Sequence, residues 1–125
     1  MTSINQAVAK YFEDCEKGCN NLISCESLNE KIKQNPKDLF VLDIRKEEDF
    51  KKGHVDGAVN IFWYDVGECI DVLPKDKKII VICYSGQSAG QIVSLLKLLG
   101  YDACSLKGGM LNGWVKNSLP VKEGC

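Results

Sequence analysis

The short segment Cys83-Tyr84-Ser85-Gly86-Gln87-Ser88-Ala89 contains the residue types best suited to chemistry in this chain. An apolar run over 79–83 ends in the cysteine, and an amphipathic stretch over 88–99 begins just after the turn. A turn that leads into a helix can direct several backbone N–H groups and the positive end of the helix dipole at one point. Such surroundings stabilise a thiolate, the nucleophilic form of cysteine. The segment therefore predicts a nucleophilic Cys83, with a buried structural cysteine as the alternative.

Strands and helices alternate along the chain around this segment. Continuous apolar runs over 39–44 and 79–83 are typical of strands buried on both faces, and shorter strands are predicted over 58–61 and 103–106. Helices are predicted over 3–17, 88–99 and 110–116, with one helical turn in 46–52 and mostly helix over 62–73. A further helix ending near Gln34 would be capped by Ser24 or Ser27. The pattern predicts a single α/β domain with a parallel sheet between two layers of helices.

Composition narrows the possible functions. The chain has 125 residues, seven cysteines, one histidine and a formal net charge of −1. This length fits one domain, and the near-neutral charge argues against nucleic acid or an anionic membrane as a partner. Residues 1–20 lack the features of a targeting signal, and no apolar run is long enough to span a bilayer. We therefore expect a cytoplasmic protein with reduced thiols, of which at least one must stay unpaired within a monomer.

The cysteines near the N-terminus do not form a metal-binding motif. Cys15, Cys19 and Cys25 are spaced by four and six residues, and no histidine lies near them. Structural zinc sites usually have a closer pair of ligands and a fourth ligand. We expect no metal and no cofactor.

Three separated segments make the chain resemble the rhodanese family of sulfurtransferases, and they occur in the family's order. The first comprises Leu42-Asp43-Ile44-Arg45, Glu48, Phe50 and Gly53-His54-Val55-Asp56-Gly57-Ala58-Val59-Asn60-Ile61, the second Cys83 to Ser88, and the third Gly108-Gly109-Met110 with Gly113-Trp114. The resemblance implies a three-layer rhodanese-like domain over 22–121 with a five-stranded parallel sheet. An N-terminal amphipathic helical extension, 1–21, would precede it, and a short tail, 122–125, would follow it.

The resemblance further implies a thiosulfate sulfurtransferase. Cys83 would take a sulfane sulfur from thiosulfate or a similar donor as a persulfide and pass it to cyanide or a thiol, including a thiol on another protein. From its place at the end of the strand over 39–44, Asp43 is expected to anchor the active-site loop through backbone N–H groups, with Arg45 bracing it. Lys107, just before Gly108-Gly109, is the candidate to supply charge to the substrate. Backbone amides and hydroxyls of the loop would surround the persulfide; these belong to Tyr84, Ser85, Gly86, Gln87, Ser88 and Ala89.

The loop departs from one common rhodanese pattern. Many members have arginine directly after the cysteine, where this chain has Tyr84, and no basic residue lies between Cys83 and Lys97. This departure argues against tight binding of a dianion. The same resemblance places His54 in a structural turn, and Trp114 is expected to lie in the core.

Two other functions are weighed against sulfur transfer. One is a rhodanese-like module without turnover that carries sulfur or binds a regulatory partner, which the N-terminal helix favours. The other is a cysteine-based phosphatase or arsenate reductase. The resemblance implies a loop one residue longer in those enzymes, and the phosphatase pattern needs an arginine six places after the cysteine, where this chain has Ala89. That arginine binds phosphate oxygens, so its absence disfavours phosphatase activity.

Overall fold

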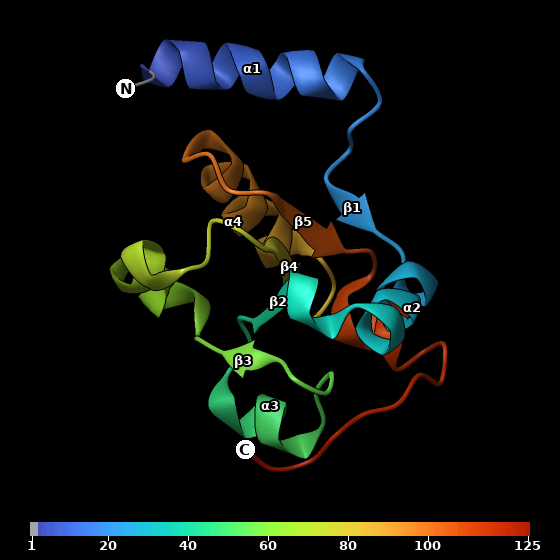
Figure 1. Ribbon diagram of the computed structural model, residues 1–125. Coiled ribbons are helices and arrows are strands. Elements are labelled where there is room, and N and C mark those ends of the chain that lie inside the picture. The colour runs from blue at the N-terminus through green and yellow to red at the C-terminus, as the bar shows by residue number, and fades with distance from the viewer. Residues whose placement is uncertain (1–2) are drawn as a thin grey trace.

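The computed structural model describes residues 3–125, which form one five-stranded parallel sheet with helices packed against it (Figure 1). The strand order is β1-β5-β4-β2-β3, with β1 (Leu22–Ile23), β2 (Leu39–Asp43), β3 (Val59–Asn60), β4 (Lys78–Ile82) and β5 (Ala103–Leu106). The α-helices are α1 (Ile4–Glu16), α2 (Cys25–Gln34), α3 (Glu47–Lys52) and α4 (Gln87–Leu98). The 3₁₀-helices are η1 (Pro36–Asp38) and η2 (Trp63–Val72), and η3 (Gly109–Trp114) is a π-helix. The predicted α/β class is confirmed.

Strand β4 is the centre of the core. Its side chains alternate between two hydrophobic clusters, one on each face of the sheet. Val81 packs in the cluster that contains the inner face of α4, and Ile80 packs in the cluster that contains Leu28 of α2 and Trp114 of η3. Because both faces are covered, every residue from Ile79 to Ile82 is fully buried, which explains the continuous apolar run in the sequence.

Several elements differ from the predictions made by sequence pattern. Strand β1 was not predicted, because two residues are too few to show a periodicity. It forms through its pairing with β5, in which Leu22 lies opposite Ser105. Of the two serines proposed as the cap of α2, Ser24 is the cap, since its hydroxyl accepts the N–H of Ser27 at 3.1 Å. The predicted helices over 62–73 and 110–116 are a 3₁₀-helix and a π-helix.

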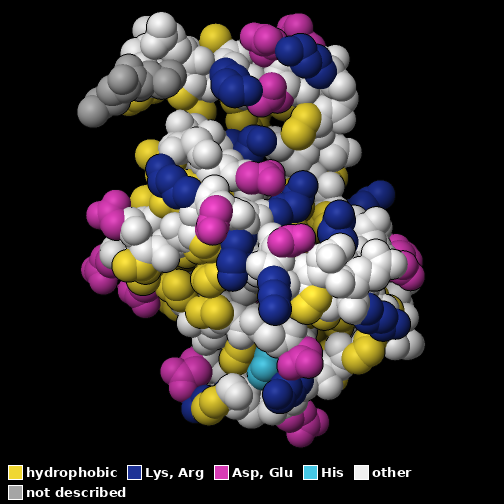
Figure 2. Space-filling view, in the orientation of Figure 1, with side chains coloured by type: hydrophobic (Ala, Val, Ile, Leu, Met, Phe, Trp, Pro, Cys, Tyr) yellow, Lys and Arg dark blue, Asp and Glu magenta, His cyan; other side chains and the backbone are white. Residues whose placement is uncertain are grey.

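Helix α1 stands apart from the rest of the molecule. A capping box between Ser3 and Gln6 begins it, and none of its residues is buried. The hydroxyl of Tyr11 lies 3.3 Å from that of Ser94 on α4, and a cavity of about 780 Å³ opens between α1 and the end of α4, below α1 in Figure 2. Neither α1 nor any other helix within residues 3–125 has the length and apolarity needed to cross a membrane.

The turn after β5 packs directly on the turn after β4. The N–H of Met110 donates to the carbonyl of Cys83 at 2.8 Å, and the N–H of Leu111 donates to the carbonyl of Tyr84 at 2.8 Å. Gly109, with φ +63°, makes this approach possible, because a Cβ there would lie 2.7 Å from the carbonyl oxygen of Cys83. The start of η3 thus fixes the backbone that follows β4.

Replacing Gly109 by alanine should destabilise the protein by more than about 2 kcal/mol, because the new methyl group would meet backbone that cannot move aside. Gly57→Ala is the matched control, since Gly57 also has positive φ (+85°) but open space around its Cβ position. The control should lose only about 1–2 kcal/mol, which is the cost of holding a residue with a Cβ at positive φ. Urea denaturation measures both free energies of unfolding, and equal losses in the two variants would disprove the close-approach argument.

Candidate active site

Cys83 follows β4 directly, at the carboxyl edge in the middle of the sheet. Only 3% of its surface is exposed, and its Sγ accepts the N–H of Gly86 at 3.0 Å and the N–H of Ala89 at 3.4 Å. Gly86 is left-handed (φ +101°) and is the N-cap residue of α4, so the chain reverses around the sulfur before the helix begins. Two N–H donors and the positive end of α4 can therefore stabilise negative charge on this sulfur.

The other residues of the loop differ in their exposure to solvent, and their side chains do not hydrogen-bond to the sulfur. Ser85 and Gln87 are exposed, Ser88 is half-buried and Ala89 is buried. Within residues 3–125, the hydroxyls of Ser85 and Ser88 make no hydrogen bond to Cys83. The donors that the sulfur meets are thus backbone groups, and the hydroxyl donors expected from the sequence do not contact it.

Tyr84 connects the loop to α3. Its hydroxyl donates a hydrogen bond to Oδ2 of Asp49 at 2.5 Å and accepts a longer one, 3.4 Å, from the N–H of Lys46. Burial raises the pKa of the Tyr84 phenol, and the hydrogen bond to Asp49 raises it further. The phenol therefore stays protonated at neutral pH and continues to donate to the carboxylate.

Asp43 and Arg45 form a buried ion pair beside this connection. The guanidinium of Arg45 contacts both carboxylate oxygens of Asp43, at 2.8 Å for Nη2–Oδ2 and 3.0 Å for Nε–Oδ1, and Nη2 also donates to the carbonyl of Gly53 at 2.8 Å. The carboxylate also accepts the N–H of Arg45, rather than an N–H of the loop 83–89. The guanidinium of Arg45 also lies over the ring of Tyr84 in that loop, 5.9 Å from the ring centroid. The pair braces the segment between β2 and α3.

Lys107 lies at the end of β5 with an exposed side chain. Its N–H donates to the carbonyl of Ile23, and its carbonyl faces the Sγ of Cys25 at 3.7 Å. Within residues 3–125, its ammonium group makes no hydrogen bond or ion pair within 4 Å. The backbone of Lys107 is therefore well fixed, while its side chain is exposed.

His54 and Trp114 are structural. The Nδ1 of His54 lies 2.7 Å from the carbonyl oxygen of Phe50, and its ring stacks on that of Phe50 with centroids 3.7 Å apart. Trp114 is 1% exposed and donates from its indole N–H to the carbonyl of Pro120 at 2.7 Å. These contacts engage the Nδ1 of His54 and the indole N–H of Trp114.

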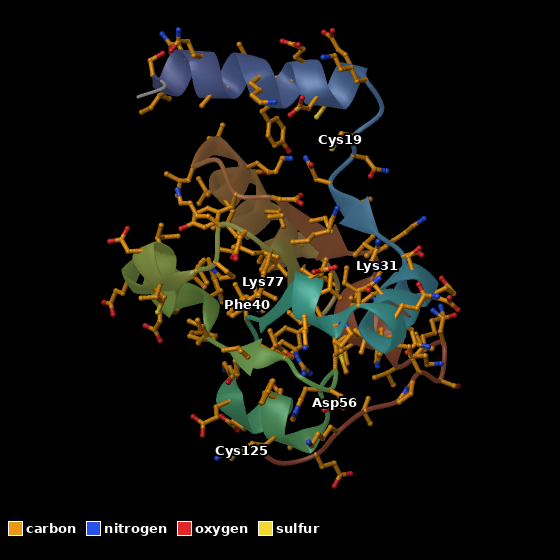
Figure 3. All side chains as sticks on the ribbon, viewed as in Figure 1. Cys19, Lys31, Phe40, Asp56, Lys77 and Cys125 are labelled. Atoms are coloured by element: carbon orange, nitrogen blue, oxygen red, sulfur yellow. The ribbon has the colours of Figure 1, made fainter. Side chains whose placement is uncertain are left out.

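The six remaining cysteines are free thiols in different surroundings. Burial raises the pKa of Cys104 to about 11 and raises that of Cys25 as well. Exposed thiols include Cys19, on the segment between α1 and β1, and Cys125, beside α3 (Figure 3). Within residues 3–125, no group of three or more His, Cys, Asp or Glu side chains is arranged to hold a metal ion.

The structure also reveals Asp49, which the sequence patterns did not single out. Its contact with Tyr84 joins residues 35 positions apart, so no local signal could have indicated it. Both residues line a groove of about 380 Å³ between α3 and η3. The other principal lining residues are Arg45, Lys52, Met110, Leu111, Val115 and Val121.

Comparisons with known proteins agree with this architecture. The family model for the rhodanese-like domain matches residues 24–117. YtwF of Bacillus subtilis is 32% identical over 98 residues, which cover 78% of this chain and 93% of that protein. The thiosulfate sulfurtransferase GlpE of Glaesserella parasuis is 32% identical over 88 residues, which cover 70% and 81%. The crystal structure of a rhodanese-related protein from Thermoplasma volcanium has a TM-score of 0.74 and 29% identity, covering 82% of this chain and 97% of that one. The chain belongs to the rhodanese-like domain family, which includes sulfurtransferases.

Proposed function

We propose that this protein is a thiosulfate-type sulfurtransferase that carries sulfane sulfur as a persulfide on Cys83. The observation that supports it is the pair of N–H groups, from Gly86 and Ala89, directed at Sγ at the N-terminus of α4. The same donors suit a persulfide, which is anionic like the thiolate.

The proposed reaction has two transfers. The Cys83 thiolate attacks the outer sulfur of thiosulfate, the Sγ–S bond forms, and the S–S bond of thiosulfate breaks as sulfite leaves with the electron pair. Cyanide or a thiol then attacks the outer sulfur of the persulfide and releases the Cys83 thiolate. A thiol on another protein is an acceptor of the same chemical kind.

The surroundings of Ala89 support sulfur over phosphate as the transferred group. The position holds a fully buried methyl group packed in the core cluster with Val81 and Ile92. A phosphate-transferring site would need a forked guanidinium there to bind phosphate oxygens. A single sulfur atom needs only the backbone donors that the loop provides.

The proposed domain spans 22–121, with 1–21 as an extension and 122–125 as a tail. Helix α1 lies outside the matched residues 24–117. The tail is tied to the domain, because Lys122 exchanges backbone hydrogen bonds with His54 and the N–H of Gly124 donates to the carbonyl of Lys51. Seven free cysteines support a reducing compartment such as the cytoplasm.

Incubation with thiosulfate should add one sulfur atom, about 32 Da, to the intact mass of the protein, and Cys83→Ser should abolish the gain. Cys104→Ser is the control and should retain it, because burial raises the pKa of Cys104 to about 11 and keeps that thiol protonated. The proposal fails if Cys83→Ser still gains sulfur, or if the wild-type protein gains none from any sulfane donor.

Turnover distinguishes an enzyme from a sulfur carrier. With excess thiosulfate and cyanide, the wild-type protein should produce many equivalents of thiocyanate per Cys83, because each transfer regenerates the thiolate. A colorimetric thiocyanate assay measures the yield. Production that stops at one equivalent would indicate the carrier module instead.

Lys107→Ala should raise the apparent KM for thiosulfate by about two- to fivefold, since one exposed charge contributes modestly to binding a dianion. The kcat should change little. Lys116→Ala, which removes another exposed charge, is the control. Steady-state kinetics measure both variants, and an unchanged KM in Lys107→Ala would remove this residue from the site.

A further inference from the structure

A polar cavity of about 370 Å³ lies at the amino edge of the sheet. The first residues of three parallel strands line it, namely Leu22 of β1, Lys78 of β4 and Ala103 of β5. Cys83 follows the last residue of β4 and therefore lies at the opposite edge. The cavity is thus separate from the proposed site of sulfur transfer.

Three lysines from three different elements line this cavity: Lys31 of α2, labelled in Figure 3, Lys78 of β4 and Lys97 of α4. Within residues 3–125, Lys31 and Lys97 have no ion-pair partner within 4 Å, and Lys78 lies 3.9 Å from a carboxylate oxygen of Asp102. Asp102 also lines the cavity, so three positive charges and one negative charge leave a net charge of +2. This excess of positive charge is suited to a dianion.

The charges of the three lysines act together on one thiol of the cavity. Cys104 is 5% exposed and lines the cavity. Burial raises the pKa of this thiol to about 11, and the three lysines counteract the rise. The first turn of α2 also lines the cavity, through Ser24 and Ser27, and brings the positive end of that helix to it. An anion bound here would therefore meet several favourable charges at once.

A second cavity, the one of about 780 Å³ between α1 and the end of α4, adjoins the first. Lys97 and Asp102 line both cavities. Lys10 and Asp14 of α1 also line the second cavity, but they pair with each other at 3.2 Å and add no net charge. An organic group attached to an anion in the first cavity would fit here, against apolar walls. The apolar lining residues are Ala7, Tyr11, Leu98, Leu99 and Tyr101.

We propose that these two cavities bind a small phosphate monoester, with its phosphate held by Lys31, Lys78 and Lys97 and its organic group beneath α1. A phosphate monoester carries about 1.5 to 2 negative charges at neutral pH, which matches the net charge of the lysine cavity. Lysine ammonium groups bind phosphate as point charges. Both volumes fall in the range of about 300–1,000 Å³ that is usual for small-molecule sites. Because the second cavity lies between two helices of one chain, a free small molecule suits it better than a phosphorylated residue of another protein.

Calorimetry with phenyl phosphate as the probe tests this binding. The wild-type protein should bind phenyl phosphate at least about threefold more tightly than inorganic phosphate, because the phenyl ring buries apolar surface. Lys78→Met and Lys97→Met should each weaken the binding about three- to tenfold, since methionine keeps an apolar stem but has no charge. Lys77→Met is the matched control. Lys77 is a half-buried neighbour of Lys78 that lines a different cavity, so this variant should bind like the wild type.

Cys19 provides an independent measurement, because this exposed thiol lines the lysine cavity (Figure 3). Saturating phenyl phosphate should slow alkylation of Cys19 by iodoacetamide at least about threefold, since the bound molecule covers the thiol. Cys125, which is exposed beside α3, is the internal control and should react at an unchanged rate. Peptide mass spectrometry measures both rates in the same sample.

Lys107→Ala distinguishes this site from the turn after β4. Lys107 follows β5 at the opposite edge of the sheet, so its removal should leave phenyl phosphate binding unchanged. The inference is overturned if phenyl phosphate does not bind, if inorganic phosphate binds as tightly, or if the lysine variants bind like Lys77→Met. It is also overturned if Lys107→Ala alone weakens binding, or if a phosphotyrosine peptide binds more tightly than phenyl phosphate. Sulfur loading of Cys83 is measured separately, so none of these outcomes bears on the proposed function.

Discussion

The turn from β4 into α4 places two backbone N–H groups against one sulfur atom, and several other parts of the structure hold this turn in position. Burial of β4 on both faces fixes where the turn begins, and the left-handed conformation of Gly86 reverses the chain around the sulfur. The carbonyls of the turn are held from the other side by the first N–H groups of η3. The hydrogen-bond donors that meet the sulfur are therefore backbone groups.

The charged side chains beside this turn are of two kinds. Asp43 and Arg45 neutralise each other in a buried ion pair, whereas Asp49 is half-buried and hydrogen-bonded to Tyr84. Asp43 and Arg45 are both almost fully buried, and burying two charges is tolerable only because each is paired and hydrogen-bonded. Together they hold the chain between β2 and α3, so that Arg45 lies over the ring of Tyr84. Tyr84 in turn is hydrogen-bonded to Asp49, so this contact joins the loop after β4 to α3, two segments far apart in the sequence.

Features that depend on residues close together in the sequence could be predicted, and features that depend on residues far apart could not. The surroundings of Cys83 depend on a strand, a turn and a helix that follow one another, and the sequence predicted all three. Strand β4 was also predictable, because burial on both faces leaves a continuous apolar run. Strand β1 and the role of Asp49 were not, because each depends on a partner, β5 or Tyr84, that lies far along the chain.

Helix α1 has a consequence for the dynamics of the molecule. It buries none of its own residues, and the hydroxyl pair Tyr11–Ser94 is its side-chain hydrogen bond to α4 in the part of the chain that the structure describes. Its opening therefore costs far less free energy than global unfolding, so its backbone amides will exchange with deuterium by a local, subglobal route. The amides of β4 lie at the opposite extreme, protected until the whole domain unfolds.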